Sequence, residues 1–309
     1  MGLLFPGQGA QAPGMGEALV AGDREADLLD LAQGEGVELR RLLVSGTASE
    51  LRPTEVAQPA LFYTGVALSG LLLEAGLEPA VAAGHSLGEF CALTAAGALG
   101  AEDGMRLVLA RGRLMAQAPP GTMAAVLGME VEQLEPICRQ VDAAGEACVI
   151  ANDNSPGQLV VSGTAAGVAL LAELAPAAGA RRVVPLQVGG AFHSPLMAEA
   201  AATFAALVDQ VAVRAPRFPI ATGVEGALVR DSAQVRVGLR RQLDSPVRWR
   251  QAVAAMVGLG VRTFVECGPG NTLAGLMRRI EPEARTLSLS QPQGVSELLG
   301  ALRPEALRS

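Results

Sequence analysis

The sequence contains no lysine, and its 24 strongly basic residues are all arginine. Its 31 acidic residues outnumber them and give a net charge of −7, and the arginines form no basic block. Nucleic-acid binding relies on a concentrated positive surface that neutralises phosphates. The charge pattern therefore argues against a nucleic-acid-binding protein.

Aromatic residues and cysteines are also scarce. Phe, Trp and Tyr make up 3% of the chain although hydrophobic residues make up 50%, so the core must consist mainly of Ala, Leu and Val side chains. Cys91, Cys138, Cys148 and Cys267 follow neither a CxxC spacing nor a paired pattern. We therefore expect reduced, mostly buried thiols, and neither a zinc site nor a disulfide framework.

The amino-terminal residues lack the cationic start and the long apolar stretch of a secretion signal. Residues 56–73 carry no charge and are nearly long enough to cross a bilayer, but they contain Gln58, Pro59 and several small polar residues. We expect this segment to be a buried core helix of a cytoplasmic protein that has no membrane contact.

Short apolar runs alternate with longer stretches of helical period, which is typical of βαβ units. A chain of 309 residues has room for one large domain, or for a large domain and a small one. Strands are expected over 3–5, 80–84, 219–221 and 263–266, and helices over 59–74, 88–96, 104–116, 194–211 and 247–257. The sequence thus predicts an α/β fold with a mostly parallel sheet.

The pattern changes between residues 121 and 189. Here we expect, in order, a strand at 123–127, a helix at 131–143, strands at 148–151 and 158–162, a helix at 165–174 and a strand at 182–185. This β-α-β-β-α-β order is the ferredoxin-like arrangement. We predict a small ferredoxin-like domain over 121–189, inserted into a large domain made of residues 1–120 and 190–309.

The sequence Gly84-His85-Ser86-Leu87-Gly88 follows an expected strand and precedes an expected helix. This is the GxSxG nucleophile elbow in the context that the motif requires. Glycines leave room for the tight turn, which exposes the serine hydroxyl beside the free N–H groups of the helix start. Ser86 is therefore the candidate nucleophile.

A serine hydroxyl needs a base to take its proton, and histidine is the side chain best suited to that task at neutral pH. The chain has two histidines. His85 lies inside the elbow, where its side chain should point away from Ser86 and simply pack at the turn. His193 lies in a loop before an expected helix, which makes it the candidate base; the alternative is an ordinary residue at a helix start.

Several motifs occur in one order along nearly the whole chain. They are Phe5-Pro6-Gly7-Gln8-Gly9, Gln58-Pro59-Ala60, the elbow, Arg111-Gly112, Asn152 to Gln158, the segment around His193, Arg241-Gln242-Leu243, Pro246-Val247-Arg248-Trp249 and Glu266-Cys267-Gly268-Pro269-Gly270. Together they resemble the malonyl-CoA:acyl carrier protein transacylases of fatty-acid synthesis and the related acyltransferase domains of polyketide synthases. The fold of this family implies a large α/β-hydrolase-like domain with a ferredoxin-like insertion.

The resemblance also implies roles for the catalytic residues. Gln8 and the backbone N–H of Leu87 would form the oxyanion hole, where one donor is typically worth ~10²–10³ in rate. The backbone carbonyl at Gln242 would orient His193 in place of a carboxylate. Without the resemblance, the glycine-flanked Gln8 would be taken as part of a simple turn.

Further roles concern the acyl group. Arg111 would hold the free carboxylate of malonate, since a planar guanidinium can donate two parallel hydrogen bonds to it, although most helical arginines are solvated. Phe192 resembles malonyl-selective members. Gln58 and Asn154 match pocket-lining positions, but each could equally brace a loop or cap a helix.

The implied reaction is transfer of a malonyl group from malonyl-CoA to the phosphopantetheine thiol of acyl carrier protein through an acyl-serine, without a metal or redox cofactor and by a chain expected to be monomeric. Carrier docking is expected on some of seven arginines: Arg181, Arg182, Arg240, Arg241, Arg248, Arg278 and Arg279. Alternatives are a discrete acyltransferase of a polyketide synthase, a serine esterase or thioesterase, and a non-catalytic interaction module. The missing acid partner and Arg111 argue against the esterase.

Overall fold

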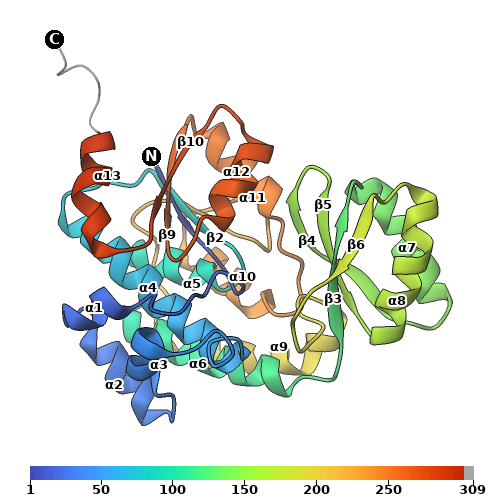
Figure 1. Cartoon of the computed structure of the whole chain (residues 1–309), viewed down its shortest axis with the longest axis horizontal. Helices are drawn as coiled ribbons and strands as arrows, with labels where there is room; N and C mark the ends of the chain where they lie inside the picture. The colour runs from blue at the N-terminus through green and yellow to red at the C-terminus, as the bar shows by residue number, and fades with distance from the viewer. Residues whose placement is uncertain (303–309) are drawn as a thin grey trace.

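Two β-sheets organise the chain in the computed structural model, which describes residues 1–302 (Figure 1). The larger sheet has the strand order β10-β9-β1-β2-β7-β8, with every neighbouring pair parallel except β7 and β8. Its strands are β1 (Gly2–Phe5), β2 (Val81–Gly84), β7 (Ile220–Ala221), β8 (Leu228–Val229), β9 (Thr263–Cys267) and β10 (Arg285–Leu289). The α/β class predicted from the sequence is confirmed.

Helices cover both faces of this sheet, which is why its central strands are apolar throughout. On β1, Leu3 and Phe5 point into the larger core cluster, and Leu4 points into a second cluster on the opposite face. The helices are α1 (Glu17–Ala21), α2 (Ala26–Gly34), α3 (Leu39–Ser45), α4 (Thr54–Glu74), α5 (Gly88–Ala95), α6 (Ala101–Gln117), α9 (Ala198–Val208), α10 (Ser232–Arg241), α11 (Trp249–Gly258), α12 (Thr272–Ile280) and α13 (Val295–Leu302). Residues of α4, α5 and α6 fill the first cluster, and residues of α11 and α12 fill the second.

The smaller sheet is antiparallel, has the order β4-β5-β3-β6 and lies beside the larger one (Figure 1). Along the chain its elements are β3 (Thr122–Leu127), α7 (Val131–Ala143), β4 (Cys148–Ser155), β5 (Gln158–Gly163), α8 (Ala165–Leu174), the short 3₁₀ helix η1 (Ala175–Ala178) and β6 (Arg182–Pro185). The bounds predicted for α7, α8 and β6 are confirmed. The strand predicted at 148–151 continues to Ser155, because it bulges twice and still pairs with β5.

One segment joins the two sheets directly. The backbone N–H of Val247 donates to Ala151 on β4 at 2.8 Å, and its carbonyl accepts from Asp153 at 2.9 Å. Arg250 on α11 then forms ion pairs with Asp153 and Glu130. The polar loops from both sheets are thereby held beside the elbow.

Helix α4 tests the prediction made for residues 56–73. It is long and apolar enough to cross a membrane by length and composition, but 78% of its apolar window is buried inside the fold. The predicted core helix is confirmed. It begins at Thr54 and not at Pro59, so the proline lies inside the helix and does not start it.

Other predictions need small changes. The helix predicted over 194–211 is split into the 3₁₀ helix η2 (Pro195–Met197) and α9, because Pro195 and the Ser194 side chain shape a tighter first turn. Helices α1, α2, α3, α10, α12 and α13, the 3₁₀ helix η3 (Pro292–Gly294), and strands β8 and β10 were not predicted. Three of the four cysteines are buried and Cys138 is half-buried, as expected. The last residues of the predicted large domain, 303–309, lie outside the described part.

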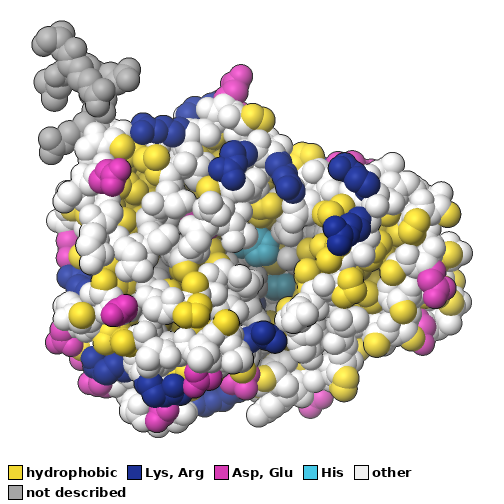
Figure 2. Space-filling model, in the orientation of Figure 1, with side chains coloured by type: hydrophobic (Ala, Val, Ile, Leu, Met, Phe, Trp, Pro, Cys, Tyr) yellow, Lys and Arg dark blue, Asp and Glu magenta, His cyan; other side chains and the backbone are white. Residues whose placement is uncertain are grey.

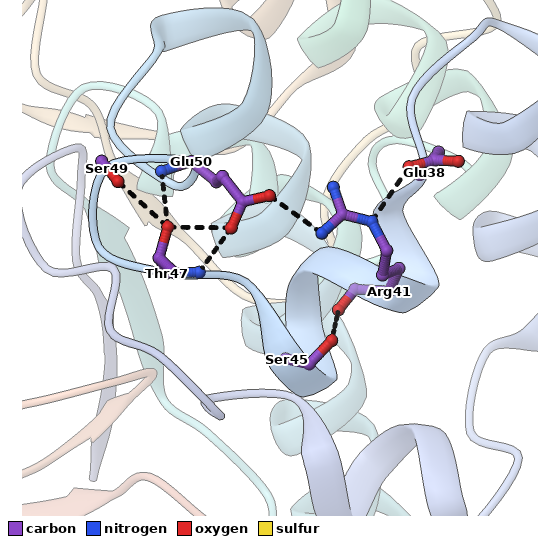
Figure 3. Close-up of polar contacts among 6 residues, drawn as sticks. All are labelled: Glu38, Arg41, Ser45, Thr47, Ser49 and Glu50. Atoms are coloured by element: carbon purple, nitrogen blue, oxygen red, sulfur yellow. Dashed lines mark hydrogen bonds and ion pairs between the residues drawn. The ribbon is translucent and has the colours of Figure 1, made fainter.

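The loop between α3 and α4 is shaped by an exposed polar network (Figure 3). Arg41 donates to Glu38 and to Glu50, both at 2.9 Å, and Glu50 also accepts from the backbone N–H and the hydroxyl of Thr47. The hydrogen bonds from Thr47, together with Arg41, lower the pKa of Glu50 to about 2. This loop leads into Thr54, which lies beside the candidate site.

Candidate active site

Ser86 lies at the turn between β2 and α5 with a φ of +50°, a conformation that non-glycine residues rarely adopt. The two glycines around it are required, because neighbouring backbone atoms leave no space for a Cβ atom at either position. A Cβ on Gly84 would lie 1.8 Å from the backbone carbon of Gly88, and a Cβ on Gly88 would lie 2.0 Å from the carbonyl oxygen of Phe5. The predicted elbow is present, and its strained turn presents the Ser86 hydroxyl to a cavity.

His193 is brought to Ser86 from 107 residues away along the chain. Its Nε2 lies 2.8 Å from the Ser86 Oγ, and its Nδ1 lies 3.1 Å from the carbonyl oxygen of Gln242 and 3.0 Å from that of Ser245. Since carbonyls only accept, Nδ1 must carry the proton, which leaves the Nε2 lone pair free for the serine hydroxyl. His193 also has a positive φ of 58°.

The charge state of His193 suits this arrangement. Burial and the nearby Arg111 lower the pKa of the imidazole to about 3, and the two carbonyls only partly oppose the shift. The ring is therefore neutral at physiological pH. Because the acceptors at Nδ1 are neutral carbonyls, the histidine is oriented without a buried negative charge beside it.

Arg111 on α6 is almost fully buried, at 1% exposure, and its guanidinium faces the same hydroxyl. Nη2 donates to the Ser86 Oγ at 3.0 Å, Nη1 to the Gln58 Oε1 at 2.8 Å and Nε to the Gln242 Oε1 at 3.0 Å. Burial lowers the pKa of Arg111 to about 10, so the side chain keeps its charge at neutral pH. Most helical arginines are solvated, and this one is fixed by three hydrogen bonds.

Gln58 and Gln242 therefore hold the arginine in place. Gln58 is completely buried on α4, and its amide nitrogen contacts the sulfur of Met115 at 3.1 Å. Gln242 serves three groups, because its backbone carbonyl accepts from His193, its Oε1 accepts from Arg111 and its Nε2 donates to the Ser86 carbonyl at 3.2 Å. One residue thus orients the candidate base and the candidate binding group.

Gln8 lies in the loop after β1 and lines the cavity with Leu87. Its side-chain amide donates to the Thr54 hydroxyl at 3.1 Å, so the side chain is already engaged. Within residues 1–302, the backbone N–H groups of Gln8 and Leu87 donate to no protein acceptor. The backbone N–H of Gln8, and not its side chain, is therefore the group that remains free for the predicted oxyanion hole.

The remaining predicted residues lie around this centre. Phe192 is buried and lines the cavity. Asn154 lies behind the cavity wall, where its Oδ1 is 2.8 Å from the His85 Nε2, and the neighbouring Asn152 lines the cavity instead. The His85 side chain leaves Ser86 as expected, and its ring packs 5.6 Å from that of Trp249.

The cavity above Ser86 has a volume of about 150 Å³. It shares lining residues with a second cavity of about 290 Å³. The shared residues include Gln8, Arg52, Met115 and Phe192. Figure 2 shows the histidine side chains inside a hollow between the two parts of the molecule. Among residues 1–302, no three His, Cys, Asp or Glu side chains gather closely enough to hold a metal ion.

Ser245 and Glu89, which form hydrogen bonds with His193 and Ser86, were given no role in the sequence analysis. Ser245 contributes only a backbone carbonyl, for which no side-chain signal exists. Glu89 follows the elbow directly and is 1% exposed, but an acidic residue in the first turn of a helix is common at solvent-exposed positions. Only its burial distinguishes Glu89 from such exposed acidic residues.

The acyl transferase domain family matches this chain over residues 3–307. A malonyl CoA-acyl carrier protein transacylase from Bacillus subtilis (strain 168) is 40% identical over 307 residues, which cover 98% of this chain and 97% of the relative. These matches span both sheets and every residue of the site.

Solved structures agree. The malonyl CoA-acyl carrier protein transacylase of Coxiella burnetii superimposes with a TM-score of 0.91 at 32% identity, covering 98% of both chains. A malonyl-transacylase in complex with its type II polyketide synthase acyl-carrier protein gives a TM-score of 0.91 at 33% identity, covering 97% of this chain and 99% of that one. This chain therefore belongs to the acyl transferase domain family, together with the malonyl CoA-acyl carrier protein transacylases.

Proposed function

We propose that this enzyme transfers a malonyl group from malonyl-CoA to the phosphopantetheine thiol of acyl carrier protein through an ester on Ser86. The observation that carries the proposal is the contact of two groups with one hydroxyl: His193 Nε2 at 2.8 Å and Arg111 Nη2 at 3.0 Å from the Ser86 Oγ. The first group suits a base, and the second suits the free carboxylate of a malonyl group.

The first half-reaction loads the serine. Ser86 Oγ attacks the thioester carbonyl carbon while its proton moves to His193 Nε2. The oxygen of the tetrahedral intermediate is positioned for the free backbone N–H groups of Gln8 and Leu87. The carbon–sulfur bond then breaks, and the leaving sulfur takes the proton from His193 to give free coenzyme A.

The second half-reaction reverses these steps with a different thiol. The phosphopantetheine thiol of the carrier gives its proton to His193 and attacks the ester carbonyl carbon. The carbon–oxygen bond to Ser86 breaks, and His193 returns the proton to Oγ. Every step uses side chains and backbone of this protein, so the proposal includes no metal or redox cofactor.

Arg111 gives the proposal its acyl specificity. The malonyl carboxylate would replace the serine hydroxyl as a partner of the guanidinium and receive two charge-assisted hydrogen bonds. An acetyl group has no such oxygen atoms and leaves the buried cation with fewer partners. Gln58, Gln242 and Phe192 contribute indirectly, the first two by fixing Arg111 and Phe192 by bordering the acyl cavity.

Fatty-acid synthesis is the proposed pathway, since the curated relatives are malonyl CoA-acyl carrier protein transacylases. A role with a polyketide synthase is the second candidate. It is favoured by the similarity to the malonyl-transacylase solved with a type II polyketide synthase carrier. Loading assays with both kinds of carrier protein would separate the two.

The carrier would dock on four exposed arginines, Arg181, Arg182, Arg278 and Arg279, here called the arginine patch. Arg279 donates to Gln158 at the β4–β5 turn, and Arg181 packs against Gly128, so the patch bridges α12 and the small sheet. None of the four pairs with a carboxylate of residues 1–302. Figure 2 shows basic side chains over α12 and β6, on both sides of the hollow.

The other three arginines predicted for docking fit less well. Arg240 pairs with Asp209, and Arg241 pairs with Glu225 at 3.1 Å, so their charges are compensated. Arg248 borders a separate cavity between α7, β4 and α11. An acidic carrier therefore suits the arginine patch better than these positions.

The finer description of the fold is part of this proposal. The β3-α7-β4-β5-α8-β6 order and the antiparallel pairing support a ferredoxin-like domain at 121–189, inserted into an α/β-hydrolase-like domain. The elbow between β2 and α5 supports the hydrolase-like part. A monomeric state and a cytoplasmic location remain predictions.

Intact-protein mass spectrometry after brief incubation with malonyl-CoA tests the function. We expect a malonyl adduct that is absent in Ser86→Ala, much weaker with acetyl-CoA, and lost when carrier protein is added. Free malonate without an adduct would favour the esterase or thioesterase reading. If neither an adduct nor turnover is observed, malonyl transfer is contradicted and the non-catalytic interaction module is favoured.

A further inference from the structure

Among residues 1–302, no charged side chain forms a hydrogen bond or an ion pair with Arg111. Its three hydrogen bonds go to the neutral side chains of Gln58, Gln242 and Ser86. The Phe90 ring also lies near the guanidinium, with its centre 5.8 Å from the guanidinium carbon. A buried cation with neutral partners needs a compensating charge nearby.

Glu89 is a buried carboxyl group that is linked to this network through hydrogen bonds. Its backbone N–H donates to the carbonyl oxygen of Ser86 at 3.1 Å, and the amide of Gln242 donates to the same oxygen at 3.2 Å. Its side-chain Oε2 accepts from the backbone N–H of Gly223 at 2.9 Å. Glu89 thus lies behind Gln242, which in turn holds Arg111, and the proposed reaction assigns it no step.

Glu89 is a member of this network that changes charge near neutrality. Burial, with a smaller contribution from Glu225, raises the pKa of Glu89 to about 7, although Gly223, Arg111 and Gln242 act in the opposite direction. The pKa of Arg111 is about 10 and that of His193 is about 3, so both keep their charge states between pH 6 and 8. Glu225 is partly exposed and pairs with Arg241.

A malonyl carboxylate on Arg111 would change this balance. One guanidinium would then interact with two buried carboxylates, the malonyl group in the cavity and Glu89 behind Gln242. Like charges that lie close together in a buried site cannot both stay ionised without cost. A proton taken from solvent by Glu89 restores one positive charge against one negative charge. An acetyl group brings no charge and requires no such proton.

We propose that Glu89 is the counter-charge of Arg111 in the free enzyme and takes up one proton when a malonyl carboxylate binds Arg111. The inference rests on the proposed malonyl transfer. The proton returns to solvent when the malonyl group leaves on the carrier thiol. Glu89 contacts neither the nucleophile side chain nor the acyl group, so it is a positioning residue that acts through Arg111.

The test is the pH dependence of acyl-Ser86 formation, measured as kcat/KM with malonyl-CoA and with acetyl-CoA between pH 6 and 8.5. For malonyl-CoA we expect a fall of about tenfold from pH 6 to pH 8, since kcat/KM follows the ionisation of the free enzyme. No such fall is expected for acetyl-CoA. Glu89→Gln should remove the malonyl-specific fall, because the amide stays neutral.

Glu266→Gln is the matched control. Glu266 is also completely buried and accepts backbone N–H bonds, from Leu273 and Ala274, but these lie at the start of α12 and outside the Arg111 network. Its profile should follow that of the unchanged enzyme. A malonyl-specific fall that persists in Glu89→Gln, or that is absent from the unchanged enzyme, would overturn the inference.

A second measurement covers the case in which Glu89→Gln does not fold. The unchanged enzyme is loaded in weakly buffered solution at pH 8 with a pH indicator, with acetyl-CoA as the reference for protons released by coenzyme A. We expect an additional uptake close to one proton per malonyl-serine, and equal values for both donors would overturn the inference. If no malonyl-serine forms at all, the proposed function itself fails, which is a distinct result.

Discussion

The Arg111 Nη2 lies 3.0 Å from the Ser86 Oγ, so the residue proposed to hold the malonyl carboxylate also touches the proposed nucleophile. The hydroxyl is held from two sides, because it donates to His193 Nε2 and accepts from Arg111. Acyl recognition and nucleophile positioning therefore share one hydrogen-bonding centre. Changes at this centre should alter the choice between acyl groups as well as the rate.

Arg111→Ala should lower malonyl loading by roughly 10²–10⁴-fold, because two charge-assisted hydrogen bonds of about 1.5–3 kcal/mol each would be lost. Acetyl loading should fall much less. Rates of adduct formation with the two donors measure the effect. Arg113→Ala is the control, since Arg113 lies on the same helix but pairs with Glu35 at the surface; an equal loss for both donors would contradict the assigned role.

Gln242→Leu should separate the role of the backbone carbonyl of that residue from the roles of its side chain. The backbone carbonyl that accepts from His193 stays, and Ser245 supplies a second carbonyl. The side-chain acceptor for Arg111 is lost, so we expect malonyl loading to fall roughly tenfold, as for one hydrogen bond to a charged group. Acetyl loading should change little, and a uniform collapse of both activities would show that His193 had been displaced.

His193 should leave the enzyme active at unusually low pH. With its pKa near 3, acetyl loading should hold between pH 7 and 5, whereas an unshifted imidazole of pKa 6.5 would cost about 30-fold at pH 5. A titration of kcat/KM with acetyl-CoA tests this. A loss centred near pH 6.5 would contradict the neutral buried ring.

The same ionisation affects stability. Below pH 6.5 the unfolded chain binds a proton at this residue, whereas the folded chain does not bind it until about pH 3. The free energy of unfolding therefore decreases as the pH falls through this window. His193→Ala should show a smaller loss over that range. Urea unfolding at pH 7 and pH 5 compares the two proteins, and parallel losses would argue against the shift.

Gly88→Ala should prevent stable folding or cost more than about 3 kcal/mol, because its Cβ would lie 2.0 Å from the carbonyl oxygen of Phe5. Gly238→Ala is the matched change. Gly238 lies inside α10 with nothing near its virtual Cβ, so alanine should stabilise the protein by about 0.5–1 kcal/mol. Thermal unfolding of both variants checks the pair.

Charge reversal in the arginine patch should weaken the second half-reaction more than the first. For Arg182→Glu combined with Arg279→Glu we expect a KM for carrier protein raised roughly tenfold, and a weaker salt dependence than in the unchanged enzyme. Arg106→Glu on α6 is the control, since Arg106 is exposed and already paired with Glu102. Equal effects of both changes on carrier KM would argue against docking at the patch.

Local patterns were sufficient for several elements. The predicted bounds of α7, α8 and β6 match the structure, because periodic apolar residues between turn signals define them within one short segment. The helices at 17–45 and the edge strand β10 were missed. Their sequences mix charged and apolar residues, and only packing against α4, α6 and β9 makes them regular.

The sequence by itself determined the elbow, the α/β class and the identity of the two groups on Ser86, because glycine spacing, residue type and motif order are local properties of the chain. Tertiary structure alone decided the protonation states and the hydrogen-bond partners of these groups at neutral pH. The neutral Nδ1–H form of His193, the three partners of Arg111 and the burial of Glu89 depend on carbonyls and side chains that the fold brings from distant segments. Electrostatic energies depend on distance and on exclusion of water, and neither is written in the order of residues.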